Sequence, residues 1–168
     1  MNASYLEVDG KPRLVRHERL GLGLAVDVAK DDGSRTLLVP CIRDADTLDF
    51  RGFWQAYEDV IRKVRNNKLS PDDFAGTTVS LTNPGTIGTE RSVPRLMPGQ
   101  GLIVGVGRID YPASYQAADP RVLADLGLSK VITVSSTYDH RIIQGAESGL
   151  FLKRVHDLLL GGDGFYED

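Results

Sequence analysis

The sequence predicts an α/β fold of two layers, in which a largely antiparallel sheet packs against helices on one of its faces. Short strand-like segments bounded by turn residues come first along the chain. Segments with apolar residues at helical spacing follow, and this order is typical of a two-layer sandwich. The sequence has neither GxGxxG nor a GxxxxGK stretch followed by Ser or Thr, which argues against a Rossmann fold and against a nucleotide phosphate loop.

The first forty residues are predicted to form two hairpins, because alternating apolar segments flank clusters of Asp, Gly and Lys. In the second hairpin, apolar side chains recur at every other position of the first strand and so share one face. The first hairpin pairs 5–8 with 13–15 around a turn at 9–12, and the second pairs 22–28 with 35–42 around a turn at 30–33.

The middle of the chain predicts one long helix and two strands. Phe53, Tyr57 and Val60 begin an apolar stripe at helical spacing, which places a helix over 49–67. Ser70 followed by Pro71 and two acids is typical of an N-cap, so a short helical turn is expected there. Strands are predicted at 77–82, which ends in an Asn-Pro-Gly break, and at 101–107, where glycines indicate close approach of another backbone segment.

The last third of the chain predicts a loop at 112–116, a short helix at 121–126, a strand at 130–136 and a helix at 146–160. The final helix is expected to direct five apolar side chains inward: Leu150, Phe151, Val155, Leu158 and Leu159. Residues 161–168 are rich in glycine and acid, so we expect a tail or linker after a single domain over 1–160.

Composition excludes several classes of function. The chain has 168 residues, of which 41% are hydrophobic and 26% charged, as is usual for a globular domain. A net charge of −3 argues against a nucleic-acid partner. Cys41 is the only cysteine, so neither an internal disulfide nor a CxxC metal site is possible. The apolar runs are far shorter than the roughly 20 residues of a membrane span, and no signal peptide is visible, so we expect a cytoplasmic protein.

His140 is the first candidate catalytic residue. It ends a strand-like run just before an amphipathic helix, and a histidine takes and returns a proton near neutral pH. Because side chains alternate along an extended chain, Asp139 and Arg141 would point away from His140 and form a structural ion pair. A structural, hydrogen-bonding role for His140 is the alternative.

Thr82 is the second candidate. It lies where a strand gives way to the Asn83-Pro84-Gly85 turn, so its hydroxyl and nearby backbone N–H groups are placed to donate to an oxyanion. The alternative is that Thr82 and Asn83 satisfy the backbone groups of the turn.

Together these two segments resemble the catalytic domain of the dihydrolipoamide acyltransferases of 2-oxoacid dehydrogenase complexes. The shared features are the Asp139-His140-Arg141 triplet and the stretch from Ser80 to Gly85. The stretches 83–89 and 136–149 look closer still to the acyltransferase-like domain of actinobacterial multifunctional 2-oxoglutarate dehydrogenase (α-ketoglutarate decarboxylase). The resemblance covers about 21–160 and implies a chloramphenicol-acetyltransferase-like sandwich with a mixed, largely antiparallel sheet.

The resemblance implies transfer of a succinyl group from dihydrolipoamide to coenzyme A within a 2-oxoglutarate dehydrogenase system of the tricarboxylic acid cycle. His140 would remove the proton of the coenzyme A thiol, and Thr82 would donate to the tetrahedral oxyanion. Gln144 stands where the family has an acidic residue four positions after the histidine, so slower chemistry is expected. Coenzyme A and lipoamide would be substrates, with no cofactor tightly bound.

The resemblance also implies partners. Family members form trimers whose active sites lie between subunits, so His140 and Thr82 would come from different chains and a monomer would be inactive. A lipoyl domain and a 2-oxoglutarate decarboxylase are the expected partners, and the latter would hold thiamine diphosphate and Mg²⁺. Because the family's domains begin several dozen residues earlier, the chain is expected to be a fragment.

Three hypotheses for the function therefore remain: an acyltransferase, a non-catalytic oligomeric core that positions the decarboxylase, and a thioesterase in which His140 acts as the base that activates water. The sequence does not place the basic residues that would contact coenzyme A phosphates. The candidates for that role are Arg95, Arg108 and Lys130.

Overall fold

A mixed six-stranded sheet forms the centre of the computed structural model, which describes residues 1–167. The strand order is β4-β3-β6-β7-β8, and β5 pairs with part of β3. β3, β6 and β7 run parallel to one another, whereas β4, β5 and β8 pair antiparallel with their neighbours. The strands are β3 (Leu22–Ala29), β4 (Arg35–Leu38), β5 (Cys41–Ile42), β6 (Val79–Thr82), β7 (Leu102–Asp110) and β8 (Val131–Tyr138).

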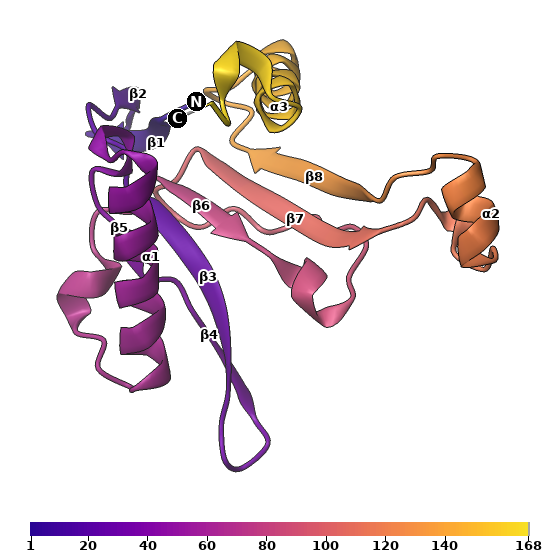
Figure 1. The fold of residues 1–168 in the computed structure, drawn as a ribbon. Helices are drawn as coiled ribbons and strands as arrows, with labels where there is room; N and C mark the ends of the chain where they lie inside the picture. Colours follow the sequence, from indigo (N-terminus) through magenta and orange to yellow (C-terminus); the bar gives the residue numbers. More distant parts are fainter. Residues whose placement is uncertain (168) are drawn as a thin grey trace.

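The two long helices cover the same face of this sheet (Figure 1), which confirms the predicted two-layer sandwich. The strand register puts Leu24, Leu81, Val104 and Ser136 in one row across the sheet. Helix α1 (Phe50–Arg65) packs on this face around Leu24. Helix α3 (Gly145–Leu159) is joined to the same face by a hydrogen bond of 2.8 Å between the hydroxyls of Ser136 in β8 and Ser148 in α3. The short helix α2 (Pro120–Asp125) lies apart from the other helices, in the connection between the end of β7 and the start of β8 (Figure 1).

The start and end of α1 follow the predicted signals. The Asp49 carboxylate accepts a hydrogen bond of 2.7 Å from the Gly52 N–H, which satisfies one free donor of the first turn. Basic residues occupy the last turn, where their positive charges interact favourably with the negative end of the helix dipole. The buried residues of α1 are Val60 and Val64, two of the apolar residues whose spacing predicted the helix.

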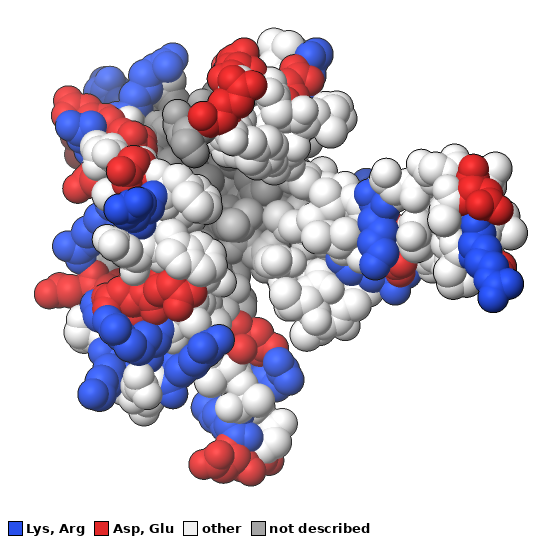
Figure 2. All heavy atoms as spheres, viewed as in Figure 1, with Lys and Arg blue, Asp and Glu red and all other residues white. Residues whose placement is uncertain are grey.

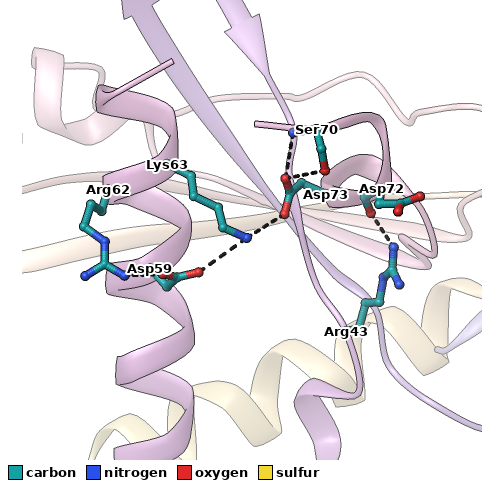
Figure 3. A network of polar contacts seen from close by, with 7 residues as sticks. All are labelled: Arg43, Asp59, Arg62, Lys63, Ser70, Asp72 and Asp73. Carbon is teal, nitrogen blue, oxygen red and sulfur yellow. Dashed lines mark hydrogen bonds and ion pairs between the residues drawn. The ribbon is translucent and has the colours of Figure 1, made fainter. Parts of the chain in front are cut away.

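A polar network ties the end of α1 to the short helix η2 (Pro71–Phe74), as Figure 3 shows. Lys63 Nζ lies 2.9 Å from Asp73 Oδ1, and the Ser70 N–H donates to Asp73 Oδ2 at 2.8 Å. These donors, with the Ser70 backbone N–H the strongest, lower the pKa of Asp73 to about 2. Ser70 is the N-cap of η2, so the predicted cap is confirmed.

Both predicted N-terminal hairpins are present. β1 (Ala3–Val8) and β2 (Lys11–Arg16) form a separate two-stranded sheet joined by Asp9 and Gly10, whose positive φ angles of 51° and 69° suit a tight hairpin turn. Ser4 is buried there, and its hydroxyl lies 2.9 Å from His17 Nε2, so His17 has a structural partner.

The inward face of α3 differs from the prediction. Leu150 is 67% exposed and Leu159 is 48% exposed in the chain, so neither belongs to the core. The buried residue is Ser148, and Leu150, two positions further on, is rotated by about 200° to the opposite side of the helix. Leu159 is the last residue of the helix. Phe151, Val155 and Leu158 are half-buried, as expected.

Cys41 and its neighbour Pro40 are both buried. Trp54 of α1 is 52% exposed and stacks on Tyr57, with the two ring centroids 5.7 Å apart. The described part of the tail includes one short turn, η5 (Gly162–Gly164), whereas Asp168 lies outside the described residues. The division of the chain into 1–160 and a tail stays a prediction.

Candidate active site

His140 lies on a tight turn that joins β8 to α3. The Asp139 N–H donates to the Gly101 carbonyl at 2.9 Å, which extends the contact between the chain segments of β8 and β7 by one residue. The Asp139 carbonyl then accepts from the N–H groups of Ile142 and Ile143, at 3.1 and 2.9 Å. His140 is therefore presented by a backbone with few free groups, and its side chain is exposed.

The neighbours of His140 form the predicted ion pair. Arg141 Nη2 lies 2.6 Å from Asp139 Oδ2, and the Asp139 side chain is only 9% exposed. The hydrogen bonds from Arg141 lower the pKa of Asp139, so this carboxylate stays ionised. The Arg141 guanidinium also lies 3.7 Å above the Tyr5 ring, which links the turn to β1. His140 itself lies near Tyr138, with ring centroids 5.5 Å apart.

Gln144 is the N-cap residue of α3, four positions after His140. Its backbone N–H donates to Glu147 Oε2 at 2.7 Å, so a carboxylate of the first helical turn holds the start of the helix. The Gln144 side chain is exposed. An amide there is able to donate a hydrogen bond but carries no charge.

Thr82 ends β6, and a short helix, η3 (Pro84–Ile87), follows it. Asn83 Oδ1 accepts from the Gly85 N–H at 3.2 Å, so Asn83, not Thr82, caps this turn. Gly85 packs directly on β7: a Cβ atom there would lie 2.3 Å from the Gly107 carbonyl carbon. The turn after Thr82 is thus fixed by close backbone packing that only glycine permits.

Thr82 lines two hollows of the surface. One is a cleft of about 480 Å³ between β3, α1 and η3, which the Asp27–Arg35 ion pair also lines. The other, of about 280 Å³, lies under the segment that precedes β7, and Arg95 is among its lining residues. The Thr82 side chain is half-buried. A hydroxyl in this position is accessible to a bound small molecule.

His140 and Thr82 do not meet within one chain. In the register of the sheet, Tyr138 lies opposite Leu102, and Leu102 lies opposite Val79. Thr82 lies three residues further along β6, about 10 Å from that row, whereas His140 follows Tyr138 in the other direction. His140 therefore lies beyond one end of the sheet, whereas Thr82 lies near the middle of the neighbouring strands.

The three basic candidates for coenzyme A contacts have different surroundings. Arg108 contacts Asp110 at 3.2 Å and Gln116 at 3.0 Å, and Lys130 Nζ lies 5.7 Å from the centre of the Tyr111 ring. Of the three, Arg95 lines the cavity of about 280 Å³ together with Thr82. The sequence offered no signal for this, because the cavity is assembled from segments that are distant along the chain.

The structure also bears on metals and membranes. Among residues 1–167, no three His, Cys, Asp or Glu side chains are grouped so that they would hold a metal ion. In the same part of the chain, no helix is long and apolar enough to cross a bilayer. Figure 2 shows the charged side chains gathered over α1, on the β3–β4 hairpin and around α2, with a largely uncharged surface between the hairpin and α2.

Comparison with known sequences gives one family. Residues 1–162 match the family described as 2-oxoacid dehydrogenases acyltransferase (catalytic domain). A protein named multifunctional 2-oxoglutarate metabolism enzyme from Mycobacterium sp. strain JLS is 58% identical over 99% of this chain. A protein of the same name from Mycolicibacterium vanbaalenii is 54% identical over 100% of it. The chain spans 13% of the length of these relatives.

Solved structures of this kind share the fold. The catalytic core of a 2-oxoacid dehydrogenase complex from Thermoplasma acidophilum has a TM-score of 0.74 at 28% identity, over 97% of this chain and 65% of that one. The cubic core of a pyruvate dehydrogenase complex gives 0.70 at 30% identity, over 94% and 60%. Azotobacter vinelandii dihydrolipoamide acetyltransferase gives 0.68 at 29%, also over 94% and 60%; in that work a serine, a histidine and an asparagine are studied for their role in its catalytic mechanism.

Proposed function

We propose, because this chain belongs to the family of 2-oxoacid dehydrogenase acyltransferases (catalytic domain), that it transfers a succinyl group from dihydrolipoamide to coenzyme A. The observation that carries the proposal is His140, exposed on a turn that the ion pair between Arg141 and the buried Asp139 carboxylate holds in place. The succinyl group is supported by the relatives named for 2-oxoglutarate metabolism, since decarboxylation of 2-oxoglutarate leaves a four-carbon unit that becomes a succinyl thioester when a lipoyl disulfide oxidises it and is itself reduced to dihydrolipoamide.

In the proposed reaction His140 acts as general base. It takes the proton of the coenzyme A thiol, because the thiolate is the nucleophile and a thiol with a pKa near about 8.5 is mostly protonated at neutral pH. The thiolate sulfur forms a bond to the thioester carbon, and the carbonyl oxygen becomes an oxyanion. Thr82 donates a hydrogen bond to that oxyanion, a contact whose removal typically costs about 100- to 1000-fold in rate. The bond to dihydrolipoamide sulfur then breaks, and this sulfur takes the proton from His140.

Gln144 is proposed to contribute a hydrogen bond near His140. In the Azotobacter enzyme the asparagine studied for its catalytic role follows the histidine by four positions, the spacing of Gln144 after His140 here. An amide at this spacing is therefore compatible with catalysis in a related enzyme. The absence of a carboxylate affects how fast the proton moves and does not remove the base.

The site is proposed to form between two chains, as part of a homotrimer. The separation of His140 and Thr82 along the sheet supports this arrangement, since one chain alone leaves each of them without the other. A closed ring of three chains would pair His140 of each with Thr82 of its neighbour. A lipoyl domain and a 2-oxoglutarate decarboxylase, the latter with thiamine diphosphate and Mg²⁺, would supply the acyl group within the tricarboxylic acid cycle.

Mixing two inactive variants tests the chemistry and the two-chain site together. We expect His140→Ala and Thr82→Ala each to lower formation of succinyl-CoA from succinyl-dihydrolipoamide by about 100-fold or more. When the two variants are denatured, mixed in equal amounts and refolded, about one quarter of the contacts between chains carry both intact residues, so about one quarter of the wild-type activity is expected to return.

A mixture that stays inactive, although its oligomers match wild type in size, would contradict a shared site. Refolded wild type is the control for the yield of the procedure, and each variant refolded alone is the control for restored activity. Separated monomers are expected to be inactive in the same assay with both residues intact.

The second candidate function is a non-catalytic oligomeric core that positions a decarboxylase. Large apolar side chains on several elements support assembly: Phe50 is 80% exposed, Ile87 is 73% exposed and Leu160 is 75% exposed in the single chain. Wild type that forms trimers but makes no succinyl-CoA would favour this candidate over the enzyme.

A further inference from the structure

One cation lines the smaller cavity beside Thr82. This cavity, of about 280 Å³, lies on the face of the sheet opposite α1 and α3, because Thr82 aligns with Ala25 and Gly105 and not with the row that contacts the helices. Among residues 1–167, Arg95 is the only charged residue that lines it. The others are apolar or carry a hydroxyl or thioether.

The charge of Arg95 is not neutralised by a carboxylate in the described part of the chain. In residues 1–167, no carboxylate oxygen lies within 4.0 Å of its guanidinium. Arg35, which lines the neighbouring cleft, is by contrast paired with Asp27. Arg95 is also exposed at the rim, so its guanidinium is accessible to a ligand.

Two other polar groups of the cavity are already engaged. The Ser80 hydroxyl donates to Gln100 Oε1 at 2.6 Å, and both residues are buried. The Ser92 carbonyl accepts from the Ser135 hydroxyl at 2.6 Å. The groups left to contact a ligand in this cavity are the Thr82 and Ser92 hydroxyls and the Arg95 guanidinium, and of these only the guanidinium is charged.

The Thr82 hydroxyl and the Arg95 guanidinium match the two ends of a succinyl thioester. If Thr82 donates to the thioester oxygen, the free carboxylate lies two methylene groups away, about 4 Å from the thioester carbon. The walls between are apolar, from residues such as Ala25, Val39 and Pro84, and they suit the methylene groups. An acyl group without a carboxylate would leave the guanidinium with water alone.

We propose that Arg95 binds the free carboxylate of the acyl group and thereby sets a preference for acyl groups derived from dicarboxylic acids. The inference rests on the proposed acyl transfer and identifies the residue that recognises the acyl group. Arginine suits this role because its planar guanidinium donates two parallel hydrogen bonds to a carboxylate. The same cation would bind a phosphate of coenzyme A, and the experiment separates these two sources of negative charge.

The test compares two acyl groups of equal carbon number. The assembled protein is assayed with succinyl-dihydrolipoamide and butyryl-dihydrolipoamide, as wild type, Arg95→Met, Arg95→Lys and Arg91→Met. Arg91 is also exposed but does not line the cavity, so its variant is the matched control for loss of one positive charge. The KM for coenzyme A is measured for each, with 3′-dephospho-coenzyme A as a second acceptor.

We expect Arg95→Met to lower the ratio of kcat/KM for succinyl over butyryl by about 10- to 100-fold, as loss of a charge-assisted hydrogen bond predicts. Arg95→Lys should recover part of the ratio, Arg91→Met should leave it as in wild type, and the KM for coenzyme A should stay the same in both Met variants. An unchanged ratio would overturn the proposal, as would a raised KM for coenzyme A that disappears with the dephospho acceptor.

Failure of the proposed function is separable from failure of this inference. If wild type transfers neither acyl group, binding of the two thioesters is measured directly by calorimetry with wild type and Arg95→Met. A preference of wild type for the succinyl thioester that Arg95→Met abolishes would support the carboxylate site without catalysis. Equal affinity for both thioesters would overturn it.

Discussion

Gln144 gives the most direct test of the chemistry around His140. A carboxylate at this position would stabilise the imidazolium that forms when the coenzyme A thiol loses its proton, so we expect Gln144→Asp to raise kcat by about 2- to 10-fold. The measurement is steady-state formation of succinyl-CoA at saturating substrates.

Gln144→Asn is the matched control. Both new residues are better N-caps for α3 than glutamine, so both variants share any gain in stability. Only the aspartate adds a charge. An equal rate in the two variants, or a lower rate for Gln144→Asp, would count against a role of charge at this position.

The contacts around His140 were only partly predictable from the sequence. The Asp139–Arg141 ion pair was predicted from alternation along an extended chain, and the structure has it. The contact of Arg141 with Tyr5 was not predicted. No local pattern relates a residue of the first strand to one in the turn after the last strand, because their contact depends on how the whole chain folds. For the same reason Arg95 remained one basic candidate among three.

The packing of η3 on β7 is expected to be sensitive to one methyl group. Gly85→Ala places a Cβ atom against the Gly107 backbone, so we expect a loss of about 1–3 kcal/mol in the free energy of unfolding. Acyl transfer should also fall, because the turn after Thr82 must move. Urea denaturation and the succinyl-CoA assay measure the two effects.

Gly149 provides the control for this prediction. It lies in α3, and a Cβ atom there would meet nothing within 4 Å. Gly149→Ala is therefore expected to raise the free energy of unfolding by about 0.5–1 kcal/mol, since alanine favours helix. If both variants changed stability in the same direction, close packing at Gly85 would not be the cause.

The contact between α1 and η2 predicts a defined dependence on pH. The folded-state pKa of Asp73 is lowered from 3.8 to about 2, so the ionised form is stabilised by folding. This contribution is complete above pH 3.8 and is lost as the pH falls toward about 2. We expect the difference in unfolding free energy between wild type and Asp73→Asn to shrink through this range, as measured by urea denaturation at several pH values.

Asp72→Asn is the neighbouring control. The group of Asp72 that accepts a hydrogen bond, from Arg43, is its backbone oxygen, and the substitution keeps this oxygen. The same acid dependence in both variants would contradict the assignment of the effect to Asp73.

At the scale of the elements, most of the fold was predictable. The hairpins, α1, η2 and the strand before Thr82 follow from turn residues, caps and apolar spacing, which are local signals. The parallel order of β3, β6 and β7 was not apparent, because the strands are joined by long connections. The inward face of α3 was assigned from hydrophobicity alone. The face that packs contains Ser148, which a search for apolar residues passes over.

At the scale of the molecule, the candidate site was only half predictable. Motifs identified His140, Thr82 and Gln144, whereas their separation along the sheet follows from strand order and register. The exposed apolar residues also support assembly of several chains, since a single chain leaves Phe50, Ile87 and Leu160 in contact with water. The roles of His140 and Thr82 stay proposals that the mixing experiment tests, and the role of Gln144 is tested by its own two variants.

The β1–β2 hairpin gives the molecule one further property. It pairs with no other strand among residues 1–167, and an isolated two-stranded ribbon is only marginally stable in water. Its order therefore comes from contacts such as Tyr5 beneath Arg141 and the Ala3 carbonyl against Gly101. Since Gly101 and Arg141 flank the turn of His140, fraying of the hairpin and misorientation of the imidazole are thermodynamically linked. Contacts that hold the β1–β2 hairpin in place therefore also restrict the orientation of the His140 imidazole.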